Sequence, residues 1–135
     1  LRNPRQHSIF NLPCSTGLTS VLSGRSSGQD IITRLPLVAN LSVLPTGAIP
    51  PNPLELVGRP EFSKLLTDLS QRYDVILIDT PAGKDYSDAL MLAAHAGGAL
   101  ILARKDRTRL EAVRALCVKL SVSGTPVIGS VFNKY

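Results

Sequence analysis

The second half of the chain carries uninterrupted apolar runs that alternate with amphipathic segments. Residues 75–78 and 99–103 are apolar throughout, which is typical of strands covered on both faces of a parallel sheet. This pattern predicts strands at 75–78, 99–103 and 127–132, with helices at 87–95 and 110–120. Strand and helix therefore alternate as in βαβ units, and the predicted fold class is α/β.

The first half predicts shorter elements, separated by polar and proline-rich segments. Residues 1–14 lack periodicity and are expected to form a loop, and residues 25–30, rich in Ser and Gly, a solvated turn. Edge strands are expected at 31–32 and 35–38, although Pro36 weakens the second. The other predicted elements are a helix at 16–22 that Gly24 closes, a strand at 41–44, a helix at 54–57 and a helix that ends near Arg72.

A carboxylate, Asp79, directly follows the predicted strand at 75–78. In open α/β sheets ligands bind outside the carboxyl ends of the strands, so a carboxylate there can hold a cation. A hydrophobic run that ends in Asp is also the second nucleotide motif of P-loop enzymes, the Walker B motif. An Asp that merely caps the next turn gives the same pattern, and the pattern alone slightly favours this capping interpretation.

Polar residues also mark the predicted helix starts in the second half. Ser87 or Asp88 can cap the helix at 87–95, and Thr108 with Glu111 has the spacing of a capping box. Residues 104–109 form a basic loop that could meet a phosphate or a neighbouring subunit, but a solvated strand-to-helix loop is the commoner explanation.

Composition suits one globular domain in a reducing compartment. The chain has 135 residues, is 44% hydrophobic and carries a net charge of +5, which suits an anionic partner such as a nucleotide, nucleic acid or membrane surface. Cys14 and Cys117 lie far apart without metal-ligand spacing, so neither zinc nor a disulfide framework is expected. The longest apolar stretch, 89–103, is shorter than a membrane span, and no targeting segment is recognised.

Residues 45–53 include four prolines and predict a rigid, extended connector. Such a stiff segment can present a surface to a partner. It can equally serve as a spacer between a strand and a helix, and proline content alone favours the spacer.

Five motifs occur in a characteristic order along essentially the whole chain. They are residues 1–4, 17–24, 44–56, 74–81 and 87–89. The most specific of them is the Thr-Gly-x-Ile-Pro-Pro-Asn-Pro-x-Glu-Leu stretch that begins at Thr46. Together these motifs resemble one family, the bacterial tyrosine kinases of capsule and exopolysaccharide synthesis (BY-kinases). The resemblance raises the Walker B interpretation of Asp79 above the capping interpretation.

The resemblance implies a fold and an ATP site. BY-kinases are similar to the MinD and ParA ATPases, so the chain is expected to form part of a P-loop NTPase, a Rossmann-like three-layer sandwich with a mostly parallel sheet. These enzymes use ATP with Mg²⁺ and autophosphorylate a C-terminal tyrosine cluster. By this likeness Asp79 holds Mg²⁺, through water, and acts in catalysis. Asn133 matches a position near the adenine, although a turn residue explains it equally well.

The resemblance also implies partners. The proline-rich segment looks like the family's subunit-contact element, which displaces the spacer interpretation. Its expected contact residues are Pro50, Pro51, Asn52, Pro53 and Glu55. The expected partners are further copies of the chain and a membrane adaptor of the polysaccharide co-polymerase type, with no nucleic acid. The expected location is the cytoplasmic face of the bacterial membrane.

Two departures from the family pattern limit these expectations. No Gly-x-x-x-x-Gly-Lys-Ser/Thr motif, the lysine loop that cradles phosphates, occurs in the 135 residues. The tyrosine cluster is missing as well, with only Tyr135 at the end. We therefore interpret residues 1–135 as the C-terminal part of one kinase domain, trimmed at both ends. Such a chain is expected neither to bind ATP tightly nor to phosphorylate itself, and its incomplete sheet should expose an apolar edge that favours dimerisation.

Two other functions stay open. A nonenzymatic oligomerising module degenerate from this family would keep the contact surface without the ATP site. A MinD- or ParA-like positioning ATPase is suggested by Ala82 and Gly83, which follow Asp79-Thr80-Pro81 in place of a second proline. His7 and His95 are expected to be surface and helix-end residues, and Tyr73 and Tyr86 are weaker candidates as phosphoacceptors.

Overall fold

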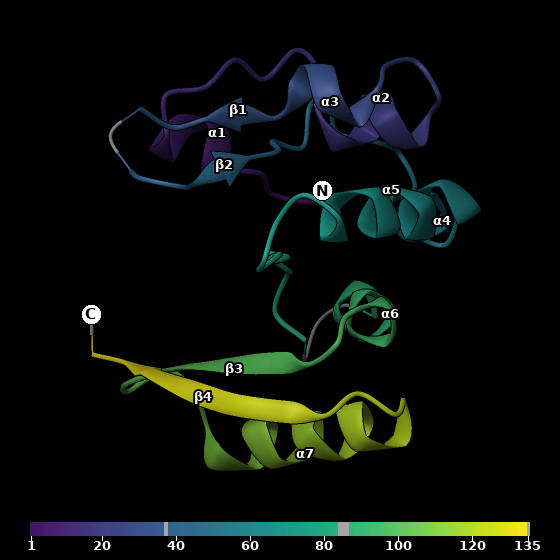
Figure 1. The fold of residues 1–135 in the computed structure, drawn as a ribbon. Helices are drawn as coiled ribbons and strands as arrows, with labels where there is room; N and C mark the ends of the chain where they lie inside the picture. The colour runs from purple at the N-terminus through teal and green to yellow at the C-terminus, as the bar shows by residue number, and fades with distance from the viewer. Residues whose placement is uncertain (37, 84–86, 135) are drawn as a thin grey trace. The chain divides into compact units, whose positions relative to one another are not determined.

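A computed structural model describes residues 1–36, 38–83 and 87–134 (Figure 1). The chain divides into two compact units, Leu1–Leu77 and Ile78–Tyr135. In the described part of the chain, no helix combines the length and the apolar character needed to cross a membrane.

The second unit contains a β-strand, a helix and a parallel β-strand in sequence. Strand β3 (Ala99–Arg104) pairs in parallel with β4 (Val127–Asn133), and α7 (Leu110–Val122) connects them. The register pairs Leu100 with Gly129 and Arg104 with Asn133, after a shift next to Ala99. The predicted strands at 99–103 and 127–132, the helix between them and the α/β class are confirmed.

The core of the second unit lies on one face of the β3–β4 pair, where α7 packs (Figure 1). Ile101 of β3 and Leu120 of α7 are buried together with Ala93 of α6 (Asp88–His95). Partly buried neighbours complete this core: Leu90, Ala99, Val113, Leu116 and Cys117. Side chains alternate between faces along a strand, so Leu100 and Leu102 point away from α7, and both are exposed.

The predicted strand at 75–78 is the main error in the secondary structure. The structure assigns neither helix nor strand to residues 75–80. Val75 is 73% exposed and Leu77 is 85% exposed, so the run is not covered on both faces. A strand exists only where a neighbour supplies matching N–H and C=O groups, and the described strands pair only as β1–β2 and β3–β4. Apolar composition alone does not provide that neighbour.

The first unit is built from short helices around one small antiparallel strand pair. Strands β1 (Thr33–Arg34) and β2 (Ser42–Val43) pair Thr33 with Val43. The helices are α1 (Gln6–Ile9), α2 (Leu18–Leu22), α3 (Gly28–Ile31), α4 (Pro53–Val57) and α5 (Pro60–Ser70). The hydrophobic core of this unit includes Leu22, Ile31, Leu35, Val43, Leu56, Val57, Phe62 and Leu65. The predicted helix at 16–22 and the strand at 41–44 are confirmed in shorter form, and the predicted helix at 54–57 is confirmed and begins one residue earlier, at Pro53.

Two glycines let the proline-rich segment lie against the start of α2. A Cβ atom on Gly17 would stand 2.3 Å from the backbone nitrogen of Gly47, so only glycine fits there. The N–H groups of Leu18 and Thr19 donate to the carbonyls of Pro45 and Thr46 at 2.8 and 2.9 Å. Residues 45–52 form neither helix nor strand and are fixed to α2 by these backbone hydrogen bonds, whereas Pro53, the last residue of the predicted connector, begins α4 (Pro53–Val57).

Several local predictions in the first unit are wrong. Residues 1–14 contain α1, and the expected turn at 25–30 contains the start of α3. The Ser27 hydroxyl donates to the Asp30 carboxylate at 2.5 Å, and Gly28 lies against Leu65 of α5, so this segment is anchored. Ile31 ends a helix and is not in a strand. The expected strand at 35–38 includes residue 37, which lies outside the described residues.

The predicted capping box of α7 is also wrong. The N-cap residue is Arg109, one position after Thr108. The Thr108 hydroxyl instead accepts the backbone N–H of Arg104 at 2.9 Å and closes the preceding turn. At the start of α6, Ser87, one of the two expected residues, occupies the N-cap position, but its side chain makes no capping hydrogen bond.

Candidate functional sites

Asp79 lies in the irregular segment that precedes α6 and is exposed. The loop after it is anchored to α7, because a Cβ atom on Gly83 would come within 2.8 Å of the Leu116 Cδ1 atom. Asp79 therefore belongs to the second unit and its side chain reaches solvent. The Asp88 carboxylate, a few residues later, is only 4% exposed. Sequence analysis treated Asp88 as a helix cap and did not predict its burial.

The carboxyl ends of β3 and β4 bring Asn133 next to the basic loop at 104–109. Asn133 pairs with Arg104, and its carbonyl accepts the N–H of Lys105 at 2.8 Å. The loop turns tightly, with Asp106 at a φ of 58°, and its basic side chains are exposed. Sequence analysis considered Asn133 and this loop separately, whereas parallel pairing places them at one sheet edge, where α/β sheets bind ligands.

Asp79, the carboxylate that the sequence suggests for a magnesium ion, lies in the second unit. Among the described residues, no group of three or more His, Cys, Asp or Glu side chains could hold a metal. Mg²⁺ commonly binds through one or two carboxylates, with waters and phosphate oxygens completing its shell. The exposed Asp79 fits such a water-rich site and does not fit a site built from protein ligands alone.

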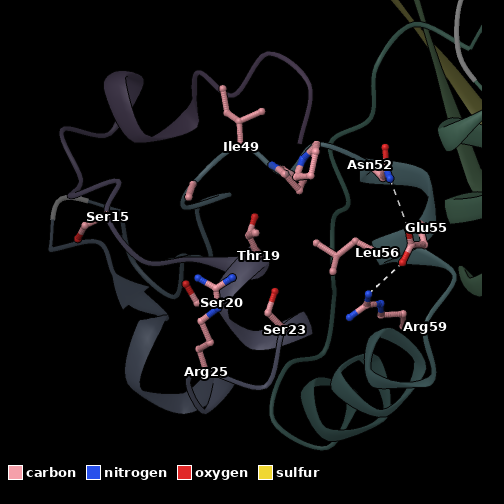
Figure 2. Close-up of a pocket in the computed structure, with 13 residues that line it drawn as sticks. Ser15, Thr19, Ser20, Ser23, Arg25, Ile49, Asn52, Glu55, Leu56 and Arg59 are labelled. Carbon is pink, nitrogen blue, oxygen red and sulfur yellow. Dashed lines mark hydrogen bonds and ion pairs between the residues drawn. The ribbon is translucent and has the colours of Figure 1, made fainter.

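The proline-rich segment of the first unit forms one wall of a pocket of about 330 Å³ (Figure 2). The opposite wall comes from α2 and the residues that flank it. The lining residues are Ser15, Thr19, Ser20, Ser23, Arg25, Ala48, Ile49, Pro50, Pro51, Asn52, Glu55, Leu56 and Arg59. Four of the five predicted contact residues, Pro50, Pro51, Asn52 and Glu55, line this pocket.

The remaining predicted contact residue, Pro53, is buried and begins α4. Its fixed φ suits the first position of a helix, where no backbone N–H is needed. The structure thus gives Pro53 a local role at the helix start. Its contribution to a subunit contact stays a prediction, as does that of the four pocket residues.

A short polar chain crosses the α4 side of the pocket. Arg59 donates to Glu55 at 3.0 Å, and the Asn52 amide donates to the other carboxylate oxygen at 3.4 Å. The hydrogen bond from Arg59, helped by Asn52 and by the charge of Arg59, holds the pKa of Glu55 below its ordinary value. Glu55 therefore keeps its negative charge, and Arg59 largely balances it.

The weaker candidates lie as follows. His95 is the last residue of α6 and is exposed, whereas His7 is half-buried in α1 with its Nε2 atom 3.0 Å from the Ser8 hydroxyl. The Arg72 guanidinium lies 5.8 Å from the centre of the Tyr73 ring. Tyr86 lies outside the described residues. The sequence contains no signal for Ser20, Ser23 and Arg25 as pocket residues, because isolated polar residues in and after a short predicted helix are typical of any solvated surface.

Comparison with known proteins gives close relatives, although no protein-family model matches the chain. The chain is 33% identical to CapB of Staphylococcus aureus over 134 residues, which is 99% of this chain and 58% of CapB. It is 31% identical to the tyrosine-protein kinase YwqD of Bacillus subtilis over 133 residues, 98% of this chain and 56% of YwqD. It is 32% identical to the tyrosine-protein kinase Wzc of Salmonella typhimurium over 134 residues, 98% of this chain and 18% of Wzc.

Solved structures agree with these relatives. The chimerical protein CapA2B2 matches with a TM-score of 0.91 at 33% identity, over 99% of this chain and 59% of that one. The kinase domain of VpsO matches with a TM-score of 0.92 at 32% identity, over 99% of this chain and 66% of that one. The chain thus spans less than two thirds of the length of each of these relatives and solved structures.

Proposed function

Because the chain is a homologue of the kinase domains of bacterial tyrosine kinases over nearly its whole length, we propose that it forms part of an ATP-dependent protein-tyrosine autokinase. We propose that this kinase regulates the chain length and the export of an exopolysaccharide or capsule. The observation that carries this proposal is the match to kinase-domain structures over 99% of the chain with a TM-score of 0.92.

In this proposal the second unit contributes to the site for magnesium ATP. The bound nucleotide supplies the phosphoryl group that is transferred to tyrosine. The Asp79 carboxylate holds Mg²⁺ through water, and Asn133 lies near the adenine. The exposure of Asp79 and the position of Asn133 at the carboxyl ends of β3 and β4 support these roles.

The 135 residues lack the lysine loop that holds the β- and γ-phosphates, so these residues form only part of an ATP site. We propose that the complete domain is a three-layer sandwich with a mostly parallel sheet. In that domain residues 75–78 pair as a strand. Their apolar, exposed side chains Val75 and Leu77 support this, since a strand inside a sheet buries such residues.

We also propose how the protein assembles. Copies of the chain contact one another through Pro50, Pro51, Asn52, Pro53 and Glu55, and a membrane adaptor holds them at the cytoplasmic face of the membrane. Support comes from the exposed position of Pro51, Asn52 and Glu55 on the first unit and from the similarity to CapA2B2. Nucleic acid is not among the proposed partners.

The gene product that contains these residues provides the test. After incubation with magnesium ATP, phosphotyrosine should accumulate on the protein, and mass spectrometry should locate it. Asp79→Asn should reduce this accumulation at least about tenfold, because the metal loses its carboxylate partner. The exposed Asp74→Asn, five residues earlier, is the matched control and should leave it unchanged.

The same test separates the competing functions. A nonenzymatic oligomerising module would bind no ATP and form no phosphotyrosine. A MinD- or ParA-like ATPase would hydrolyse ATP without forming phosphotyrosine. Either outcome would overturn the autokinase proposal.

A further inference from the structure

The pocket of the first unit has a polar side and an apolar side. Figure 2 shows Thr19, Ser20, Ser23 and Arg25 gathered at the α2 side, facing the α4 side with Asn52, Glu55 and Arg59. The apolar lining consists of Ala48, Ile49, Pro50, Pro51 and Leu56. A ligand that fills this pocket must therefore combine an apolar body with a polar group.

The charge of the pocket is positive. Glu55 is balanced by Arg59 at 3.0 Å. Arg25 is exposed and pairs with no carboxylate in the described part of the chain. The Arg25 guanidinium, with its five N–H donors, is therefore available to a ligand and favours the binding of an oxyanion.

Hydroxyl groups beside Arg25 add further donors. The Thr19 hydroxyl is committed, because it donates to the carbonyl of Thr46 at 2.9 Å. The side chains of Ser20 and Ser23, which Figure 2 shows next to Arg25, make no hydrogen bond within residues 1–36, 38–83 and 87–134. Two hydroxyls and a guanidinium match the several acceptor oxygens of a phosphate better than the two of a carboxylate.

The apolar side suits a flat ring. Leu56 is buried beneath the pocket, whereas Ile49 is 62% exposed and has apolar surface to cover. Pro50 and Pro51 are rigid, so this wall is formed before any ligand arrives. Pockets of about 300 Å³ and more are large enough for small organic ligands.

We propose that this pocket binds an aryl phosphate monoester, with the phosphate at Arg25 and the serine hydroxyls and the ring against Ile49 and Leu56. A phosphotyrosine side chain is the biological group with this chemistry. The binding itself does not depend on kinase activity, and only the source of the phosphotyrosine rests on the proposed function. The pocket would then retain the product of tyrosine phosphorylation on a neighbouring copy or another protein.

Titrations of the isotope-labelled chain, followed by amide NMR shifts, test the proposal. The probes are phenyl phosphate, phenol, inorganic phosphate, glucose 1-phosphate and a phosphotyrosine peptide with its unphosphorylated form. Phenyl phosphate and the phosphopeptide should shift Ser20, Ser23 and Ile49. They should bind at least about fivefold more tightly than inorganic phosphate, phenol or glucose 1-phosphate.

Two variants decide where binding occurs. Arg25→Gln should weaken phenyl phosphate binding about tenfold, because a charged hydrogen-bond donor is lost. Arg5→Gln removes the same charge from an exposed arginine of the first unit that does not line the pocket, and should change nothing. Unchanged spectra away from residue 25 would show that the variant is folded.

Three results would overturn the proposal. They are the absence of saturable shifts with phenyl phosphate, shifts that map outside the pocket, and equal affinity of Arg25→Gln and Arg5→Gln for phenyl phosphate. Binding of glucose 1-phosphate as tight as that of phenyl phosphate would overturn the aryl specificity. Binding of these probes requires neither ATP nor a lysine loop. The expected binding results would therefore be the same even if the protein were not a kinase.

Discussion

The close approach of Gly17 and Gly47 shows how single residues fix the first unit. Both positions leave no room for a Cβ atom, and the backbone N–H groups of Leu18 and Thr19 hold the proline-rich segment against α2. The pocket walls on the two sides of this junction are therefore positioned by backbone contacts. Side-chain changes in the pocket can be tested without disturbing them.

Gly17→Ala should destabilise the first unit by about 1–3 kcal/mol, since the added methyl group must push the backbone of residues 45–47 away. Urea unfolding followed by circular dichroism measures this. Gly97→Ala is the matched control, because a Cβ atom at Gly97 meets nothing within 4 Å. Equal midpoints for the two variants would contradict the packing at Gly17.

Arg59→Gln should raise the pKa of Glu55 toward its ordinary value of 4.5, because the main hydrogen bond that lowers the pKa is removed. Carbon-detected NMR titration of the Glu55 carboxylate measures the shift. Lys64→Gln, at another exposed cation of α5, should leave the Glu55 pKa in place. An identical Glu55 pKa in the wild-type, Arg59→Gln and Lys64→Gln proteins would exclude the Arg59–Glu55 ion pair in solution.

The sign of this effect sets its pH dependence. The folded pKa of Glu55 is depressed, so the contact with Arg59 stabilises the protein above the unfolded value of 4.5. That contribution is lost as the pH falls through the lower folded pKa. Since Glu55 is exposed, solvent screens the interaction and the change in stability should be small.

At the scale of the elements, β3 has one face packed against α7 and one face open. Ile101→Ala should destabilise the second unit by about 2–5 kcal/mol, because it leaves a cavity in the core with Ala93 and Leu120. Leu102→Ala, at a side chain that is 66% exposed, should change the stability by about 0.5 kcal/mol or less. Thermal unfolding midpoints compare the two. A larger loss for Leu102→Ala would mean that the buried face is assigned wrongly.

The sequence could predict those elements whose hydrogen bonds or packing partners lie close in the chain. The helices α4, α6 and α7 carry their own backbone hydrogen bonds, and β3 and β4 are joined by one helix. The run at 75–78 has the same apolar composition, yet its burial depends on neighbours far away in the chain. The glycine junction at residues 17 and 47 and the pocket residue Arg25 likewise arise from contacts between distant segments, which periodicity does not reveal.

At the scale of the whole molecule, two compact units carry different parts of the proposed function. The first unit carries the pocket and the proposed subunit contact, and the second carries Asp79 and Asn133. The sequence predicts exposed apolar residues for an incomplete sheet, and Leu100, Leu102 and Ile128 of the β3–β4 pair are exposed. Dimerisation of the chain through such a surface stays a prediction, which sedimentation can test.

The most direct measurement is the affinity of the complete gene product for ATP with and without Mg²⁺, in wild-type, Asp79→Asn and Asp74→Asn proteins. We expect Mg²⁺ to tighten ATP binding in the wild-type and Asp74→Asn proteins. Asp79→Asn should lose this gain, with an affinity for ATP at least about tenfold weaker. Equal magnesium-dependent affinity in all three proteins, or no ATP binding by the wild type, would contradict the proposed ATP site.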